Sequence, residues 1–233
     1  MKNIHKVLRL APSVLGLIFS VSSMHGDNLL SVSGPNDGAG LLGTAGPGVA
    51  QALGFSWTQT NTYTNMSITA LLENEPFEGT AYLTTAIGPG TTSAEEVTEA
   101  SVTVGGNSGD YSFEDLFSGL TLGPGTYYIT VFGSGASAWG ADCDPTLFSS
   151  SQCALANITT ASGFTYNSNF FSDTPTGYVP GDSFTNPGAD DNIVQITGNA
   201  VPEPSTVGLL LVGCCLLGLL RNACRILNLG GPA

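Results

Sequence analysis

Residues 120–133 read LTLGPGTYYITVFG, and this stretch decides the fold class. After the glycine-proline-glycine turn, large side chains fall on both sides of a period-two alternation: Tyr127, Ile129 and Val131 on one side, and Tyr128, Thr130 and Phe132 on the other. Such a period is that of a β-strand. Because neither side is purely polar, the pattern predicts a central strand or one covered on both faces.

Further segments with alternating apolar residues lie on either side of this stretch. They are residues 56–63, 65–72, 79–88, 100–106 and 110–117 before it, and segments around 163–171 and 192–197 after it. Gly, Pro, Asn and Asp cluster between them, as expected for turns. Disorder is the alternative for so polar a chain. The spacing of these segments favours an all-β domain, an antiparallel β-sandwich or jelly-roll-like fold.

Charge is divided sharply along the chain. All five basic residues lie near the termini, and both histidines precede residue 26: Lys2, Lys6, Arg9, Arg221, Arg225, His5 and His25. Residues 27–200 therefore contain no Lys, Arg or His but 17 acidic residues, a formal charge of −17. Nucleic acid is excluded as an electrostatic partner because phosphates need basic patches. Catalysis through a Ser-His-Asp or Cys-His arrangement and zinc sites containing His are also excluded from this region.

The N-terminus has the three parts of a secretory signal peptide. Three basic residues come first, the apolar run VLGLIFSV follows at 14–21, and small residues follow the run. The run is shorter than the ~20 residues of a membrane span. We therefore expect residues 1–26 to be a signal helix and the chain to be exported.

A second apolar run lies near the C-terminus, in VPEPSTVGLLLVGCCLLGLLRNACR at 201–225. Val207–Leu220 is 14 residues without a charge, so a membrane anchor, a buried core helix and a sorting signal all remain open. The arginines that follow suit a cytoplasmic flank. With local thinning of the bilayer, the run can still form a transmembrane helix.

The order of residues in this tail resembles the PEP-CTERM sorting domain. The resemblance covers the sorting motif, Val201, Pro202, Glu203, Pro204 and Ser205, and the basic stop formed by Arg221 and Arg225. It implies a Gram-negative bacterium that makes exopolysaccharide, and an exosortase-like membrane protease or transpeptidase as partner. It also implies membrane anchoring through the C-terminal helix before processing, then a place at the cell surface or in the extracellular matrix. The basic stop is sparse and residues 226–233 extend past it, which departs from the family pattern.

These segments predict a division of the chain into five parts. They are a signal peptide at 1–26, an irregular lead-in or edge strand at 27–54, a β-sandwich at 55–200, the sorting motif and transmembrane helix at 201–225, and a tail at 226–233. The sandwich is also loosely similar to extracellular domains that precede such tails. The expected function is that of a non-enzymatic envelope or matrix protein, associated with exopolysaccharide or binding carbohydrate.

A carbohydrate-active hydrolase is the alternative function, because two carboxylates suffice for glycoside hydrolysis. Its candidates are Glu73, Glu75, Glu78, Glu95, Glu96, Glu99 and Glu114. Solvated surface acids are the simpler interpretation of the same residues. For binding without catalysis, the available aromatic residues are Trp57, Tyr63, Trp139, Tyr166 and Tyr178, and Trp139 is expected to be the most exposed.

Two further sites are expected in loops. Cys143 and Cys153 are the two cysteines of the exported domain and predict a disulfide. No cofactor is expected from the sequence, with calcium as the alternative because this ion takes carboxylate oxygens on loops. Its candidates are Asp142, Asp144, Asp182, Asp190 and Asp191, although no EF-hand spacing is present and the same acids can simply keep the surface soluble.

Overall fold

The computed structural model describes residues 26–36, 38–46, 49–107, 109–143, 156–173, 175, 177–185, 190–201, 212, 213 and 216. The strands are β1 Asp27–Ser33, β2 Gly38–Gly46, β3 Val49–Gln59, β4 Tyr63–Glu73, β5 Phe77–Thr84, β6 Glu96–Val104, β7 Tyr111–Leu122, β8 Gly125–Cys143, β9 Asn157–Thr160, β10 Phe164–Ser172, β11 Asp190–Asn192 and β12 Val194–Ala200. Two 3₁₀ turns are added, η1 Ser93–Glu95 and η2 Val179–Gly181. The chain is an all-β, sandwich-like fold.

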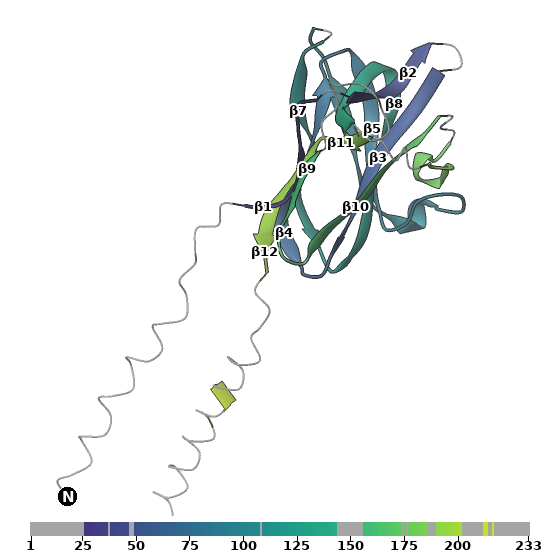
Figure 1. The fold of residues 1–233 in the computed structure, drawn as a ribbon. Helices are drawn as coiled ribbons and strands as arrows, with labels where there is room; N and C mark the ends of the chain where they lie inside the picture. The colour runs from purple at the N-terminus through teal and green to yellow at the C-terminus, as the bar shows by residue number, and fades with distance from the viewer. Residues whose placement is uncertain are drawn as a thin grey trace, which may run out of the picture.

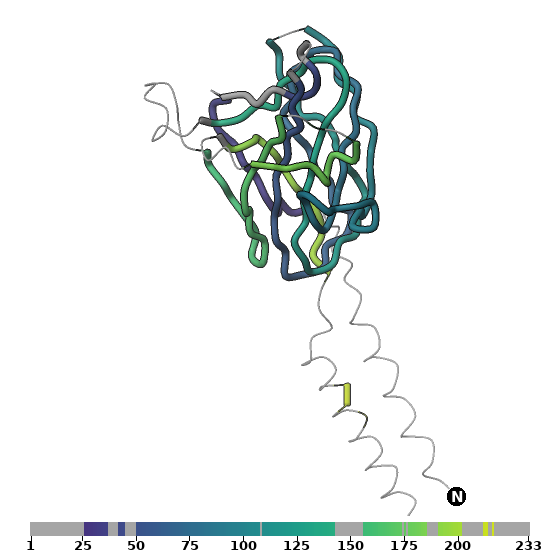
Figure 2. Tube along the Cα trace, turned by 90° about the vertical axis from the view of Figure 1, so that its right-hand side faces the viewer, coloured from purple at the N-terminus to yellow at the C-terminus, as the bar shows by residue number. Residues whose placement is uncertain are grey.

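The strands form two antiparallel groups that wrap around a common interior (Figures 1 and 2). The first group has the order β9-β1-β12-β4-β7, and the second has the order β10-β3-β8-β5-β6. β8 links the two groups. Its first half pairs with β3 and β5 of the second group, and its second half pairs with β2 and β11 and, through Trp139 opposite Leu72, with β4 of the first group. This long strand turns the sheet from one group to the other. It is the strand predicted from residues 120–133, and its pairing on both sides confirms the prediction of an interior strand.

Aromatic side chains fill the space between the groups. Trp57 of β3 and Trp139 of β8 are both fully buried, and Phe55 packs against each of them, with ring centroids 5.7 and 6.1 Å away. Tyr63 of β4 meets Phe164 of β10 edge to face at 5.7 Å. Since β4 and β10 belong to different groups, these contacts join the two groups into one hydrophobic core.

The expectation of an irregular lead-in or edge strand before residue 55 is wrong. Residues 27–33 form β1, which pairs with β12 on one side and β9 on the other. Leu29, Leu30 and Val32 of this strand are buried in the core. The segment looked irregular because glycines separate its few apolar residues, yet those residues suffice once partner strands cover them.

The turn η1 leads directly into the strand β6. η1 is a single turn with a capping box, in which the Glu95 carboxylate accepts from the Thr92 backbone N–H at 2.8 Å. β6 begins at once, at Glu96.

Few residues of the two expected terminal helices belong to the part of the chain that the structure describes. The signal helix at 1–26 lies outside the described residues except for Gly26, and of the C-terminal run Val212, Gly213 and Leu216 are described, as helical. Within the part of the chain that the structure describes, no helix has the length and apolar character needed to cross a membrane. β1 and β12 are paired, with Asp27 opposite Gly198, so the described domain starts and ends at the same end of the sheet (Figure 1).

Candidate functional site

The outer face of the second strand group carries a row of side chains that crosses all five strands. Register places Phe170, Gly54, Thr130, Tyr82 and Glu99 side by side on β10, β3, β8, β5 and β6. This row explains why residue 54 is glycine. A Cβ on Gly54 would lie 2.3 Å from the ring of Phe170 and 2.1 Å from the Ile129 carbonyl oxygen. Phe170 therefore lies flat over β3 because no side chain stands beneath it.

A segment at 177–185, which we call the strap, crosses this outer face. At one end, the backbones of Thr185 and Phe171 form a two-hydrogen-bond bridge, each bond 2.9 Å long. In its middle, the Pro180 carbonyl accepts from the Gly88 N–H at 2.9 Å. Phe184 of the strap packs edge to face on Phe170 at 5.2 Å. The strap thus adds Phe184 to the aromatic residues that the sheet itself carries on this face.

At the other end of the strap, Tyr178 lies beside two residues of the sheet. Its ring meets that of Tyr82 edge to face at 5.5 Å, and its hydroxyl donates to the Glu96 carboxylate at 2.8 Å. All three side chains are half-buried and reach the surface. This trio, Tyr82, Tyr178 and Glu96, places two aromatic rings beside a charged hydrogen-bond acceptor.

Both tyrosines of the trio keep their protons at ordinary pH. Burial raises the pKa of Tyr178, and the hydrogen bond to Glu96 raises it further. Burial also raises the pKa of Tyr82, and the nearby charges of Glu99 and Glu96 add to that effect. The Tyr178 hydroxyl is therefore a fixed donor, and it orients Glu96 with an acceptor oxygen at the surface.

The structure corrects the choice of aromatic residues. The prediction that Trp139 is exposed is wrong, because Trp139 is 0% exposed and its indole N–H donates to the Ile193 carbonyl at 3.1 Å. Trp57 and Tyr63 are also buried in the core. Tyr166 is half-buried, and its hydroxyl donates to Asp191 at 3.0 Å. Tyr178 is therefore the predicted aromatic residue that lies at a surface suited to binding.

Sequence reasoning missed Tyr82, although a signal was present. Its apolar neighbours Ala81 and Leu83 lie on the opposite side of the strand by alternation, and both are fully buried. Tyr82 must then point outward by alternation. What the sequence could not provide was the contact between Tyr82 and Tyr178, because the two residues lie about a hundred positions apart in the chain.

Two of the predicted calcium ligands lie together. Asp142 and Asp191 are direct cross-strand partners on β8 and β11, and Asp142 is 1% exposed with its Oδ1 accepting from the Asn36 N–H at 2.9 Å. Asp182 lies elsewhere, directly after η2 in the strap. Among the described residues, no group of three or more His, Cys, Asp or Glu is arranged to hold a metal ion. Asp144 and the Asp190 side chain fall outside the described part of the chain.

Most other predicted sites cannot be placed. Cys153, the side chain of Cys143, the motif residues 202–205 and both tail arginines lie outside the described residues. Val201 is placed: it is 40% exposed, and its N–H donates to the Thr62 carbonyl at 2.9 Å. The domain therefore ends one residue before the motif Pro202-Glu203-Pro204.

Four of the seven carboxylates considered for hydrolysis accept hydrogen bonds from neighbouring groups. Glu95 caps η1, Glu73 accepts from the Gly109 N–H at 2.6 Å, and Glu114 accepts from the Ser112 hydroxyl at 2.7 Å. Glu96 and Glu99 lie on β6, with Glu96 bound to Tyr178. Each of these bonds has a structural role that needs no catalysis.

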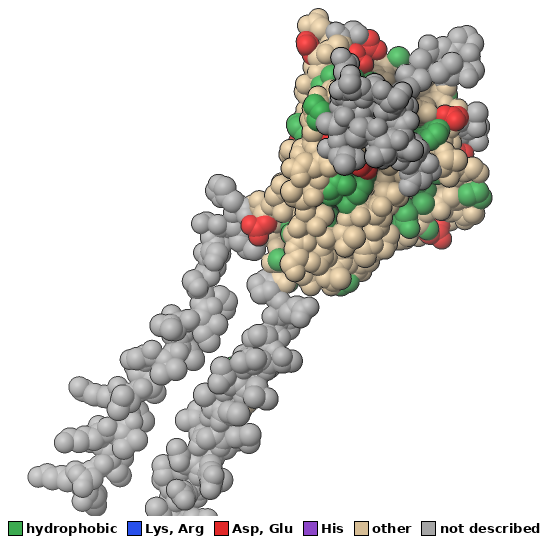
Figure 3. Space-filling model, in the orientation of Figure 1, with side chains coloured by type: hydrophobic (Ala, Val, Ile, Leu, Met, Phe, Trp, Pro, Cys, Tyr) green, Lys and Arg blue, Asp and Glu red, His purple; other side chains and the backbone are tan. Residues whose placement is uncertain are grey.

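Between residues 27 and 200 there is no positive side chain to balance the acids. In the space-filling view the described residues show scattered red and no blue or purple (Figure 3), as the composition of residues 27–200 requires. Hydrogen bonds from hydroxyl and backbone groups are what these carboxylates use instead.

Comparisons with known proteins add little. No protein family and no curated protein matches the chain. A solved structure described as "Structure of infectious bursal disease virus Gt strain" is similar over 78% of this chain and 42% of the virus chain, with 9% identity and a TM-score of 0.26. This chain thus spans less than half of that virus chain, and a likeness of this degree carries no argument.

Proposed function

We propose that this protein is an exported, non-enzymatic component of the cell envelope or extracellular matrix that binds carbohydrate on the outer face of its second strand group. The observation that carries the binding role is the trio Tyr82, Tyr178 and Glu96: two adjoining aromatic edges beside an oriented carboxylate. Sugar rings present C–H faces that pack on aromatic side chains and hydroxyls that donate to carboxylates.

The lack of basic side chains supports binding over catalysis. Residues 27–200 offer no His, Lys or Arg, so a reaction there would depend on carboxylates alone. A neutral or cationic polysaccharide fits this surface, whereas a polyanion would be repelled by the charge of −17. The finer description of the fold as a jelly-roll-like sandwich belongs to the same proposal, since such folds commonly present ligand surfaces.

Delivery by an exosortase-type system is the second part of the proposal. It rests on the resemblance of residues 201–205 to the PEP-CTERM motif, together with a signal-like N-terminus. The described domain begins and ends at the same end of the sheet, so segments attached there leave the rest of its surface accessible. A membrane-held precursor that is later cut near Pro202-Glu203-Pro204 accounts for the short apolar run, which need only reside in the bilayer before processing.

Carbohydrate binding is tested with the purified chain on a glycan array and on exopolysaccharide extracted from the native host. We expect Tyr178→Ala and Tyr82→Ala each to weaken the affinity at least tenfold. Tyr111→Ala is the matched control, because Tyr111 is half-buried on β7, outside the trio, and should change the affinity less than twofold. If the unmodified chain binds no glycan on either support, the carbohydrate role is wrong and a purely structural role replaces it.

Delivery is tested separately by mass spectrometry of the mature protein from its native host. We expect one new terminus near residue 26 and another near Pro202-Glu203-Pro204. Recovery of an intact C-terminus through Ala233 from the cell surface would refute processing by a sorting enzyme.

A further inference from the structure

Two strand edges meet without pairing at one side of the described domain. β6 ends the second group and pairs with β5, while β7 ends the first group and pairs with β4. No pairing joins β6 to β7 among the described strands. We call this gap between the two edges the seam. Its backbone N–H and C=O groups are available to a further strand.

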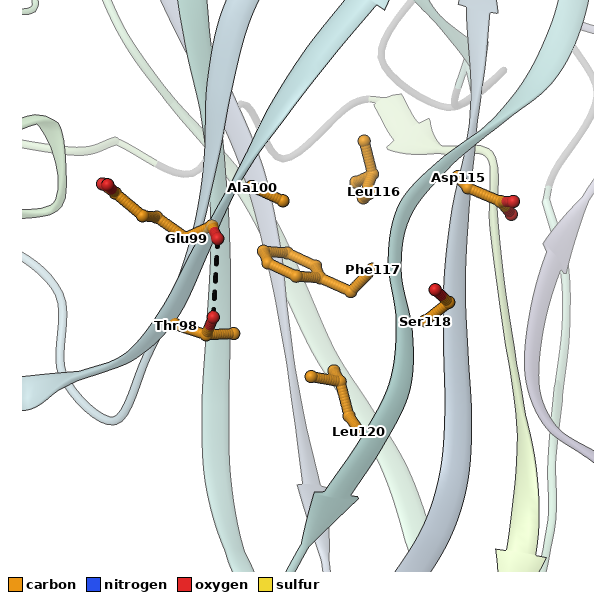
Figure 4. A pocket seen from close by; sticks show the side chains of 8 residues that line it. All are labelled: Thr98, Glu99, Ala100, Asp115, Leu116, Phe117, Ser118 and Leu120. Carbon is orange, nitrogen blue, oxygen red and sulfur yellow. Dashed lines mark hydrogen bonds between the residues drawn. The ribbon is translucent and has the colours of Figure 1, made fainter.

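A cavity of about 280 Å³ opens at the seam. Thr98, Glu99 and Ala100 line it from β6, and Asp115 to Ser118 with Leu120 line it from β7. Figure 4 shows the ring of Phe117 reaching from β7 toward β6, with Leu116 and Leu120 beside it. The carboxylates of Glu99 and Asp115 lie on opposite sides of this apolar floor and point away from it. The cavity therefore has an apolar centre and an acidic rim.

The two edges differ in their suitability as templates for another strand. β7 shifts register against β4 between Met66 and Ile68 and again between Ile68 and Thr69, so its edge is bulged. β6 pairs with β5 in continuous register from Val104 to Thr98 and has no proline. Bulges block strand addition, whereas a regular edge permits it. β6 is thus the edge that can accept a strand.

Charge decides which strand can be accepted. The seam carries Glu99 and Asp115 on its rim, and the domain around it offers no basic side chain to neutralise them. A second copy of residues 27–200 would bring a further formal charge of −17 to the same place. Repulsion therefore disfavours self-association along this edge, and a cationic partner is favoured.

We propose that the seam is a docking site for an extended, lysine- or arginine-containing segment of a partner protein. The segment adds as a strand to the free edge of β6. One of its basic side chains lays its aliphatic stem over Phe117 and brings its charged head to the carboxylate of Glu99 or Asp115. The seam and the trio share β6, because Glu96 lies on that strand and Glu99 is the cross-strand partner of Tyr82. The docking contacts involve neither tyrosine of the trio, so the proposal does not depend on carbohydrate binding.

The test uses the purified full chain and a nonapeptide of alternating lysine and valine, with calorimetry for affinity and amide hydrogen exchange for location. We expect binding that slows exchange along residues 96–104 of β6. The double variant Glu99→Lys/Asp115→Lys should weaken binding at least tenfold. The control Asp27→Lys/Asp110→Lys changes the net charge equally at two exposed sites away from the cavity, and should weaken binding less than threefold.

Two further peptides separate strand addition from general attraction to acids. The glutamate-valine counterpart should not bind. The lysine-valine peptide with N-methyl groups along one edge should lose at least tenfold in affinity, because it cannot complete the ladder of backbone hydrogen bonds. Equal weakening by both double variants, or full affinity of the N-methylated peptide, would show non-specific electrostatic binding and overturn the proposal. Circular dichroism confirms that each variant is folded.

Discussion

Gln59 of β3 is a buried polar side chain whose loss should be costly. It is 1% exposed, its amide oxygen accepts from the Trp57 indole N–H at 3.0 Å, and its amide nitrogen donates to the Leu122 and Gly123 carbonyls, each at 3.0 Å. It also donates to the Asn61 carbonyl at 3.2 Å. One side chain thus ties the end of β3 to the turn between β7 and β8.

Replacing Gln59 by leucine keeps the bulk and removes all four bonds. The Trp57 N–H and the Leu122 carbonyl then lie in the interior without this partner, at about 1–3 kcal/mol for each unsatisfied group. Allowing for the gain from an apolar side chain, we expect the free energy of unfolding to fall by about 2–4 kcal/mol. For a domain of this size, that lowers the melting temperature by about 5–15 °C.

Chemical denaturation followed by tryptophan fluorescence measures the effect. The chain has two tryptophans, Trp57 and Trp139, and both are fully buried, so their emission reports on the core directly. Gln51→Leu is the control, because Gln51 lies on the same strand but makes its bond to Asp173 at the surface. It should cost less than about 0.5 kcal/mol. Equal losses in the two variants, or a Gln59→Leu loss as small as that of the control, would refute the reasoning.

Two other predictions follow from the outer face of the second group. Gly54→Ala should lower the free energy of unfolding by about 1–3 kcal/mol, because the added Cβ would press on the Ile129 carbonyl and the Phe170 ring. Gly105→Ala is the control: its Cβ would meet no atom within 4 Å, so the stability should hardly change. Thermal unfolding compares the two variants. Folding raises the pKa of Tyr178 above 10.0, the ordinary pKa of tyrosine. Above pH 10 the folded protein therefore keeps the Tyr178 proton, whereas the unfolded chain loses it. The stability that it contributes is therefore complete below pH 10 and declines as the pH rises further, and Tyr178→Phe should flatten this decline in melting temperature measured from pH 8 to 11; an unchanged slope would contradict it.

The all-β class and the interior position of β8 could be predicted from the sequence, because strand alternation is a local property. Residues 127–132 carry that pattern whichever strands pair with them. The lack of basic residues between 27 and 200, on which the expectations about nucleic acid and histidine catalysis rest, also needs no structure. Both results depend on which residues are present and in what order.

Which aromatic side chains reach the surface was decided by the tertiary structure. Trp139 lies in a segment rich in Gly and Ser that looked like an exposed loop, yet it belongs to β8 where Leu72 pairs opposite it and the core covers it. Tyr82 and Tyr178 meet because the strap returns across a face built from distant strands. Burial and contact depend on long-range pairing, which a local pattern does not encode, so the sequence determined the kind of sheet and the fold determined which of its residues are available to bind.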